Sequence, residues 1–302
     1  MPSYKTHSIH GELILSEINN KININKEDLK IFCIGPDTLI ATDYKIFDYQ
    51  HANRVKDFFT FLIEEIKQRK LYENSEIMAY LYGQIDHFVL DVTTHPLIYY
   101  FTESAENDFR LGLHGLMEMW LDDYMCLKYY KNQQQYYHKN KINDLKLKTL
   151  INDVYLKIYN GYKESSKYEI GIEFMKNFDL HIRRNKSVIP FITKFLNLGD
   201  ITYEKDGKRV LPYLNLNHEL WLNPETGEKS YDSFEDLWYK SLEISQQTIE
   251  DVNNYIYLDK PLNNELINNN ISYNTGLPCE LGQSYKYIKK KYIKYWYTFF
   301  NK

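Results

Sequence analysis

The sequence predicts an all-α fold with room for one small β-hairpin in its C-terminal half. Across the first half, apolar residues recur at three- and four-residue spacing, which is the repeat of one helical face. Turn-forming residues concentrate between Gly199 and Gly227. Within that stretch, the segments 201–203 and 209–211 flank Asp206-Gly207 and fit the two strands of a hairpin.

Several segments have the spacing or the end signals of helices. In chain order, helices are expected at 51–70, from 74 or 75 to about 91, and at 106–131, 145–162, 168–182 and 233–257. The apolar face of the first consists of Val55, Phe58, Phe59, Leu62 and Ile66. The last begins after Ser233, a favoured N-cap residue, with Asp236 at the third helical position.

The second of these helices should end near His95. Asn74 and Ser75 are both good N-cap residues for its start. Pro96 disfavours the α conformation at the residue before it. We therefore expect His95 at, or just past, the end of the helix.

The chain should form two regions of one packed unit. Residues 1–165 would form a helical core that carries the candidate metal ligands described below, and residues 166–302 a mainly helical C-terminal region packed onto it. A chain of 302 residues is long enough to bury a substantial core in this way.

Composition and charge are those of an ordinary folded protein. The chain is 43% hydrophobic and 26% charged, which excludes wholesale disorder. Its net charge of −4 predicts no stable nucleic-acid partner. The three cysteines, Cys33, Cys126 and Cys279, are too widely spaced for a CxxC site and fit a reducing compartment. Because we find no signal peptide and no apolar run of about 18 residues, we expect a cytoplasmic location.

Histidines and carboxylates recur at helical spacing. His87 and Asp91 are four residues apart, as are His114 and Glu118, and His95 follows Asp91 by four. Side chains at i and i+4 lie on one helical face, so each pair can hold one ion. Imidazole and carboxylate are ligands that Zn²⁺ accepts in catalytic sites. One such pair alone is more often a surface ion pair, but two pairs on successive predicted helices favour a metal site.

The ordered set of motifs resembles the zinc-dependent phospholipase C family, whose helical fold is shared with the P1/S1 nucleases. The motifs are Thr6-His7, Gly35-Pro36-Asp37, His51, Tyr82-Gly83-(x)3-His87-(x)3-Asp91-(x)3-His95-Pro96 and His114-(x)3-Glu118-(x)3-Asp122. A later stretch, Tyr213-Leu214-Asn215-Leu216-Asn217-His218-(x)2-Trp221-(x)1-Asn223-Pro224, looks like members of a cytoplasmic bacterial branch.

The resemblance implies a ligand set and a catalytic role. One zinc ion would be surrounded by Asp37, His51, His87 and Asp91. A second would be held by His95, His114 and Glu118. The carboxylate matching Asp37 is the family's usual candidate for the general base.

A third zinc ion is implied less completely. Asp91 would bridge towards it, and His7 would be one of its ligands. Secreted members of the family also hold this ion through an N-terminal tryptophan. Six residues precede His7 here and none is tryptophan, so we expect two zinc ions, with a third only if another residue such as His10 completes the site. As the i+3 neighbour of His7, His10 equally fits a structural role.

Other polar residues have two readings each. Asp122 continues the face of His114 and Glu118, and either orients a histidine or is an exposed acid. Asp86 points away from the ligand face and should be solvated. His218 and Trp221 either line the substrate cleft or, as the favoured reading, form part of a core aromatic cluster.

The basic, aromatic tail from Lys286 to Lys302 also has several readings. It could be an interfacial helix that makes a peripheral contact with anionic membranes. It could also contact a nucleic-acid strand through aromatic and lysine side chains. We favour the third reading, a C-terminal helix that packs its aromatic residues on the core.

Together with the metal-ligand spacing, the resemblance implies a zinc-dependent hydrolase of phosphodiester bonds. Its substrate would be phospholipid-like, as for a phospholipase C. One alternative is a P1-type nuclease or nucleotide phosphodiesterase on the same metals. Another is a metal-stabilised binding protein without turnover, against which the complete ligand set and Asp37 argue. A phospholipase should show an apolar cleft, and a nuclease aromatic stacking platforms beside the metals.

Overall fold

The computed structural model describes residues 4–18, 23–102, 111–130, 141–184, 203–205, 208–210 and 212–288. Over these ranges the chain is mostly helical, with two short antiparallel pairs of strands. The predicted all-α class is therefore confirmed. No helix in the described ranges combines the length and apolar character needed to cross a bilayer.

The first half of the chain supplies the helices that surround the candidate site. They are α1 (Tyr4–Glu17), α2 (Lys26–Phe32), the 3-10 helix η1 (Gly35–Ala41), α3 (Tyr44–Ala52), α4 (Val55–Gln68), the 3-10 helix η2 (Leu71–Glu73), α5 (Ser75–Thr102) and α6 (Leu111–Tyr130). The helix expected over 51–70 is α4, which begins only at Val55 because the chain breaks between α3 and α4. Asn53 is extended there and Arg54 adopts the left-handed conformation with φ 56°, which an α-helix cannot continue through.

The second half contains the remaining helices and both strand pairs. They are α7 (Leu145–Tyr159), α8 (Glu164–Arg184), β1 (Tyr203–Lys205), β2 (Lys208–Val210), the 3-10 helix η4 (Pro212–Leu214), β3 (Trp221–Leu222), β4 (Lys229–Ser230), α10 (Phe234–Leu258), α11 (Glu265–Asn268) and the 3-10 helix η5 (Cys279–Leu281). Strands β1 and β2 pair as the expected hairpin, with Tyr203 opposite Val210. The β3–β4 pair was expected only as a turn. Ser233 and Asp236 form the predicted capping box of α10.

The expected end of a helix near His95 is wrong, because α5 runs through Pro96 to Thr102. Proline removes one backbone hydrogen bond and typically costs about 3 kcal/mol inside a helix. After Pro96, the side chains of Leu97, Ile98 and Phe101 are buried in one of the hydrophobic clusters of the core. Burying each large apolar side chain contributes roughly 1.5–3 kcal/mol, so packing outweighs the missing bond. His95 consequently lies on the same continuous helix as His87 and Asp91.

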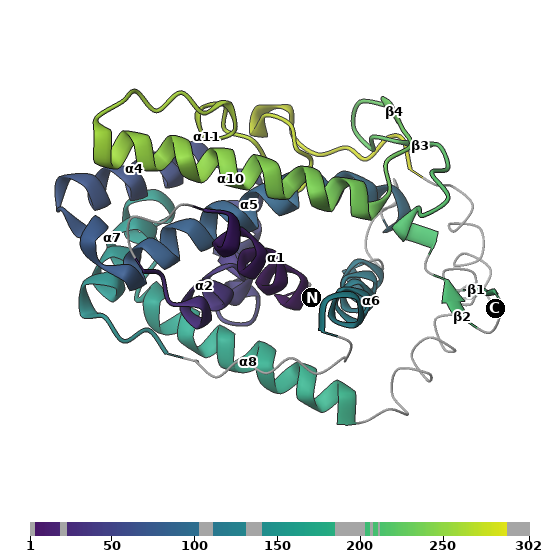
Figure 1. The fold of residues 1–302 in the computed structure, drawn as a ribbon, viewed down its shortest axis with the longest axis horizontal. Coiled ribbons are helices and arrows are strands. Elements are labelled where there is room, and N and C mark those ends of the chain that lie inside the picture. Colours follow the sequence, from purple (N-terminus) through teal and green to yellow (C-terminus); the bar gives the residue numbers. More distant parts are fainter. Residues whose placement is uncertain are drawn as a thin grey trace.

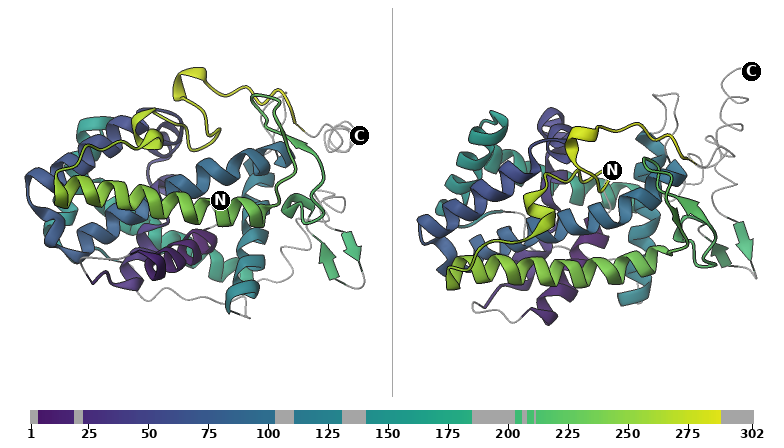
Figure 2. Two further views of the ribbon diagram at one scale, coloured as in Figure 1. Left: turned by 45° about the horizontal axis from the view of Figure 1, so that its top comes forward. Right: turned by 90° about the horizontal axis from the view of Figure 1, so that it is seen from above.

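Helix α5 is the centre of the molecule. Helix α10 packs along one side of it, and α1 and α2 pack against it as well. Figure 1 shows α10 and α8 on opposite sides of the molecule, with α1, α2 and α5 between them. The other views show α10 following the length of the helical body (Figure 2). Because α5 is covered in this way, most of its side chains are buried, including polar ones.

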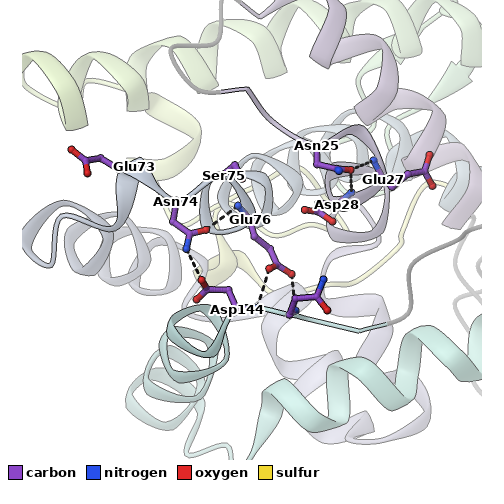
Figure 3. Close-up of a pocket in the computed structure, with 9 residues that line it drawn as sticks. Asn25, Glu27, Asp28, Glu73, Asn74, Ser75, Glu76 and Asp144 are labelled. Atoms are coloured by element: carbon purple, nitrogen blue, oxygen red, sulfur yellow. Dashed lines mark hydrogen bonds between the residues drawn. The ribbon is translucent and has the colours of Figure 1, made fainter.

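The N-termini of α2, α5 and α7 meet at a polar cavity of about 730 Å³ (Figure 3). Asn25, Asn74 and Asp144 cap these three helices by accepting hydrogen bonds from backbone N–H groups. Glu76 accepts two more, from the backbone N–H groups of Asn143 and Asp144. None of the eight predicted ligands lines the cavity. Its polar groups cap the N-termini of helices.

Gly171 sets how closely α8 approaches η1, the element that carries Asp37. A Cβ atom at Gly171 would lie 1.7 Å from the carbonyl oxygen of Thr38. Alanine normally stabilises a helix by about 0.5–1 kcal/mol relative to glycine. We expect Gly171→Ala to destabilise the protein instead, by about 3 kcal/mol, because backbone must move. Urea unfolding measures this, with Glu173→Ala on the exposed face of α8 as control. A stabilised Gly171→Ala variant would contradict the close approach.

Candidate metal centre

Three groups of histidine and carboxylate side chains lie together in the protein interior. Within each group, the candidate ligand atoms are all within 4.8 Å of one another. The groups are Asp37, His51 and His87; His95, His114 and Glu118; and His7, His87 and Asp91. All eight residues expected as metal ligands are therefore brought together in the fold.

Helix α5 supplies three of these residues, at the spacing that places them on one face. His87, Asp91 and His95 follow one another by four residues on α5, and side chains so spaced lie one above the next. The other five come from four further elements: α1 (His7), η1 (Asp37), α3 (His51) and α6 (His114 and Glu118). The site thus depends on how these elements pack around α5.

Asp91 lies at the centre, where the groups meet. Its Oδ2 atom is 3.1 Å from Nε2 of His87 and 3.8 Å from Nε2 of His51. Its Oδ1 atom is 3.2 Å from Nε2 of His7 and 3.5 Å from Nε2 of His95. One carboxylate therefore faces histidines of every group, with a different oxygen towards each side.

We call the groups Asp37–His51–His87 and His95–His114–Glu118 the two outer groups, because Asp91 lies between them. Their donor sets are similar. Asp37 places Oδ1 3.1 Å from Nε2 of His51 and 3.9 Å from Nε2 of His87. On the other side, Oε1 of Glu118 is 2.9 Å from Nε2 of His114 and 3.5 Å from Nε2 of His95. Each group offers two imidazoles and one carboxylate, which is a donor set that catalytic zinc sites use while leaving one position open.

Hydrogen bonds at the far side of three rings set which nitrogen faces the centre. The Nδ1 atoms of His51, His87 and His95 lie 2.7, 3.1 and 2.9 Å from backbone carbonyl oxygens of Phe47, Cys33 and Tyr273, respectively. A carbonyl only accepts, so in each ring Nδ1 carries the hydrogen. In the neutral tautomer Nε2 then presents a lone pair to the centre. This arrangement is typical of histidines that bind metal ions.

The buried carboxylates of Asp91 and Glu118 need positive charge beside them. Burial raises the pKa of Asp91, but His95 and His87 hold that pKa well below its usual range. Burial likewise opposes ionisation of Glu118, while His114 and His95 lower its pKa. Both carboxylates are thus held ionised although Asp91 is 2% and Glu118 is 5% exposed. Buried carboxylates need paired charge or a metal ion.

In the chain alone, protons on the histidines supply that positive charge. Burial lowers the pKa of His87, but the charges of Asp91 and Asp37 raise it to about 9. His95 also has its pKa raised to about 9, by Asp91 and Glu118 against the opposing effect of burial. Burial and the neighbouring His87 instead lower the pKa of His7.

Among the residues that the structure describes, three buried atoms at the centre have no hydrogen-bond partner. They are Nδ1 of His7, Nε2 of His87 and Oδ2 of Asp91. The last two are 3.1 Å apart, yet their geometry does not form a hydrogen bond. Unsatisfied buried polar atoms are costly. Nε2 of His87 and Oδ2 of Asp91 are donor atoms of a kind that binds Zn²⁺, so the residues present fit the metal.

His10 does not join these groups, and the expectation that Asp86 is solvated is wrong. Both side chains are fully buried. His10 places Nδ1 2.7 Å from Oδ1 of Asp86 and Nε2 2.8 Å from Oγ of Ser241. With both ring nitrogens occupied, His10 has none left for a metal ion. Asp86 is buried because α1 packs against this side of α5.

Asp122 fixes the start of α1 next to His7. It is 3% exposed and accepts hydrogen bonds from the backbone N–H and the hydroxyl of Thr6, at 2.7 and 2.8 Å, and from the backbone N–H of Lys5 at 3.2 Å. Burial raises the pKa of Asp122 to about 7 against the opposing effects of Lys5 and Thr6. The reading as an exposed acid is wrong: Asp122 holds the backbone before His7.

Residues from the C-terminal half also reach the centre, and sequence reasoning missed them. Tyr273 is fully buried, with its ring centroid 5.1 Å from that of His51. Tyr99 of α5 lies with its ring centroid 4.7 Å from that of His114 and 4.8 Å from that of Tyr285. None of the sequence patterns above singles out Tyr273, Tyr99 or Tyr285, because a tyrosine in a tyrosine-rich chain carries no indication of a metal site.

Two other expectations concern residues away from the centre. His218 is exposed and places Nδ1 3.1 Å from the carbonyl oxygen of Tyr231, so the favoured reading of a core residue is wrong for it. Trp221 is buried in a hydrophobic cluster, as that reading requires. In the tail, residues 289–302 lie outside the described residues, and its three readings stay open.

Comparison with known proteins identifies the family. The model of the family described as zinc dependent phospholipase C matches residues 6–169, which is more than half of the chain and includes all eight residues of the three groups. No curated protein and no solved structure matches the chain. The match and the predicted motifs agree on the same region, and the chain belongs to the zinc-dependent phospholipase C family.

Proposed function

We propose that this protein is a zinc-dependent hydrolase that cleaves phosphodiester bonds in the manner of a phospholipase C. The observation that carries the proposal is the meeting of three ligand groups around the single carboxylate of Asp91. Family membership supports zinc as the metal and a phospholipid as the substrate class. The cytoplasmic branch and location expected above stay predictions.

We assign the metal ligands by group. One zinc ion would be held by Asp37, His51 and His87, and a second by His95, His114 and Glu118, with Asp91 between them. A third would use His7 and Asp91, with His87 near both. When bound, zinc lowers the pKa of water towards neutrality and neutralises the negative charge of a phosphodiester.

The chain's own residues would position the reaction and move its proton. Asp37, next to His51 and His87, is our candidate for the general base that accepts the proton lost by the attacking water. The carbonyls of Phe47, Cys33 and Tyr273 hold three imidazoles in fixed orientation, which limits reorganisation during the reaction.

The donor sets argue against a purely structural metal site. A structural zinc ion is usually surrounded by four protein ligands, commonly with cysteine among them. The three free cysteines, Cys33, Cys126 and Cys279, belong to none of the three groups. The group of His95, His114 and Glu118 offers three ligand residues, so a position remains there for water or substrate. This supports turnover over a metal-stabilised binding protein.

A nuclease or nucleotide phosphodiesterase is the second candidate, favoured by a row of tilted aromatic rings beside one group. The rings of Tyr285, Tyr99 and His114 follow one another at 4.8 and 4.7 Å, with interplanar angles of 32° and 33°. Aromatic rings near a hydrolytic centre bind bases by stacking. The Tyr99 hydroxyl donates to Oδ1 of Asn274 at 3.0 Å, which fixes the central ring of the row.

Hydrolysis of bis(4-nitrophenyl) phosphate by the zinc-loaded protein tests the proposal. We expect turnover that a chelator removes and zinc restores. Asp37→Asn should lower kcat by roughly 10²–10⁴-fold, the range for loss of a general base. Asp57→Asn, at an exposed carboxylate paired with Arg54, is the matched control and should retain wild-type activity.

Two natural substrates then separate the candidates. Phosphatidylcholine vesicles should be cleaved faster than single-stranded DNA if the protein is a phospholipase. The reverse order would support the nuclease. Zinc binding with no hydrolysis of any of the three substrates would contradict the proposed activity.

A further inference from the structure

A hairpin outside the family match packs directly against the metal centre. We define the 271–278 hairpin as residues Ile271 to Pro278, which pair with each other as an isolated antiparallel bridge. The family model ends at residue 169, so the match does not cover this segment. The hairpin places Tyr273, which is fully buried, among His51, His87 and Phe88.

The hairpin holds the backbone that carries His51. The backbone N–H of Tyr273 donates to the carbonyl oxygen of His51 at 2.9 Å. The hydroxyl of Ser272 donates to the same oxygen at 3.0 Å. The Tyr273 ring packs against the His51 ring with centroids 5.1 Å apart. His51 lies in the last turn of α3. The carbonyl groups of a last turn have no N–H partner within their own helix.

The same hairpin residue also fixes a ligand of the opposite group. Nδ1 of His95 lies 2.9 Å from the carbonyl oxygen of Tyr273. This bond keeps Nε2 of His95 towards Asp91 and Glu118. The backbone of one residue, Tyr273, therefore contacts a histidine of each outer group.

The hairpin is built to hold this position. Hydrogen bonds within it run from the Ser272 N–H to the Leu277 carbonyl at 2.8 Å and from the Gly276 N–H to the Ser272 carbonyl at 3.0 Å. Gly276 adopts φ +68°, and a Cβ atom there would lie 2.9 Å from the carbonyl oxygen of Val92 in α5. The turn is thus pressed against the helix that carries His87, Asp91 and His95.

We propose that the 271–278 hairpin positions His51 and His95 and thereby sets the zinc affinity of both outer groups. The inference rests on the proposed function only in requiring that these groups bind zinc. Outer partners of metal ligands typically contribute 10–100-fold to metal affinity. Tyr273 and Ser272 are positioning residues: they act through the histidines.

Two glycines give a matched pair of variants to test the hairpin. Gly276 and Gly282 both have φ +68°, which L residues rarely adopt, so alanine strains the backbone at either position. A Cβ atom at Gly282 meets nothing within 4 Å, whereas at Gly276 it meets backbone of α5. Gly276→Ala should weaken zinc binding by about 10–100-fold, and Gly282→Ala should not change it. Competition with a chromophoric chelator measures both affinities on the full chain.

A second pair guards against loss of folding at Gly276. Ser272→Ala removes one hydrogen bond to the His51 carbonyl, and Ser230→Ala alters a serine of β4 that contacts no ligand group. Ser272→Ala should weaken zinc binding severalfold and shift the visible absorption of the cobalt(II)-substituted protein, which reports ligand geometry. Ser230→Ala should change neither. A merely structural effect would lower the stability of the chelated protein and leave the cobalt spectrum unchanged.

The outcomes separate this inference from the proposed function. A wild-type protein that binds no zinc overturns the proposed function. If the wild type binds zinc, and Gly276→Ala and Ser272→Ala bind it as tightly and with the wild-type cobalt spectrum, the hairpin inference is wrong and the proposed function stands.

Discussion

Replacing Asp91 with asparagine is expected to weaken zinc binding at more than one group at once and to abolish measurable phosphodiester hydrolysis. Asp91 directs Oδ2 towards His87 and Oδ1 towards His7 and His95. An amide keeps the shape but loses the charge and one of the two acceptor oxygens. The loss of zinc affinity should exceed about 100-fold, the upper end for residues that only support a ligand.

Zinc titration followed by elemental analysis measures the effect of Asp91→Asn. The number of ions retained after desalting should fall by at least two relative to wild type. Asp153→Asn is the control, because Asp153 is half-exposed and paired with Arg69 at the surface. Loss of a single ion with the others retained would contradict the central position of Asp91, as would wild-type retention.

Replacing His10 with leucine is expected to have the largest effect on stability away from the ligands. The His10 ring joins α1 to Asp86 of α5 and Ser241 of α10, and all three side chains are fully buried. Removing one partner of such a pair leaves a buried carboxylate uncompensated, which costs about 3–5 kcal/mol. Urea unfolding in the presence of a chelator measures the change without any contribution from metal binding.

A double-mutant cycle separates this effect from loss of packing. His10→Leu combined with Asp86→Leu removes both polar partners, so the double variant should be more stable than the sum of the two single losses predicts. His218→Leu, at an exposed histidine, should change stability by no more than about 0.5 kcal/mol. A loss below about 1 kcal/mol for His10→Leu would show that the buried pair contributes little.

The candidate ligand residues could be predicted from the sequence because their signal is local. His87, Asp91 and His95 follow at four-residue spacing, and a helical face translates that spacing directly into proximity. The resemblance to the family's motifs then added candidate ligands that lie far from these in the sequence, such as His7 and Asp37. Neither the spacing nor the motifs indicate how the helices pack against one another.

The features that sequence reasoning missed depend on contacts between distant segments. Pro96 has a local penalty, whereas the burial of Leu97 and Ile98 that outweighs it is set by tertiary packing. His10 and Asp86 are 76 positions apart, so no helical spacing relates them. Tyr273 acts through its backbone carbonyl and N–H groups, which every non-proline residue possesses, and therefore carries no side-chain signature of its role.

Elemental analysis of the purified full chain, after exhaustive desalting, tests the central claim most directly. The account predicts two or three zinc ions per chain, matching the groups around Asp91, and their loss from Asp91→Asn. Fewer than one tightly bound zinc ion per chain, in protein that is folded and has been offered the metal, would contradict it.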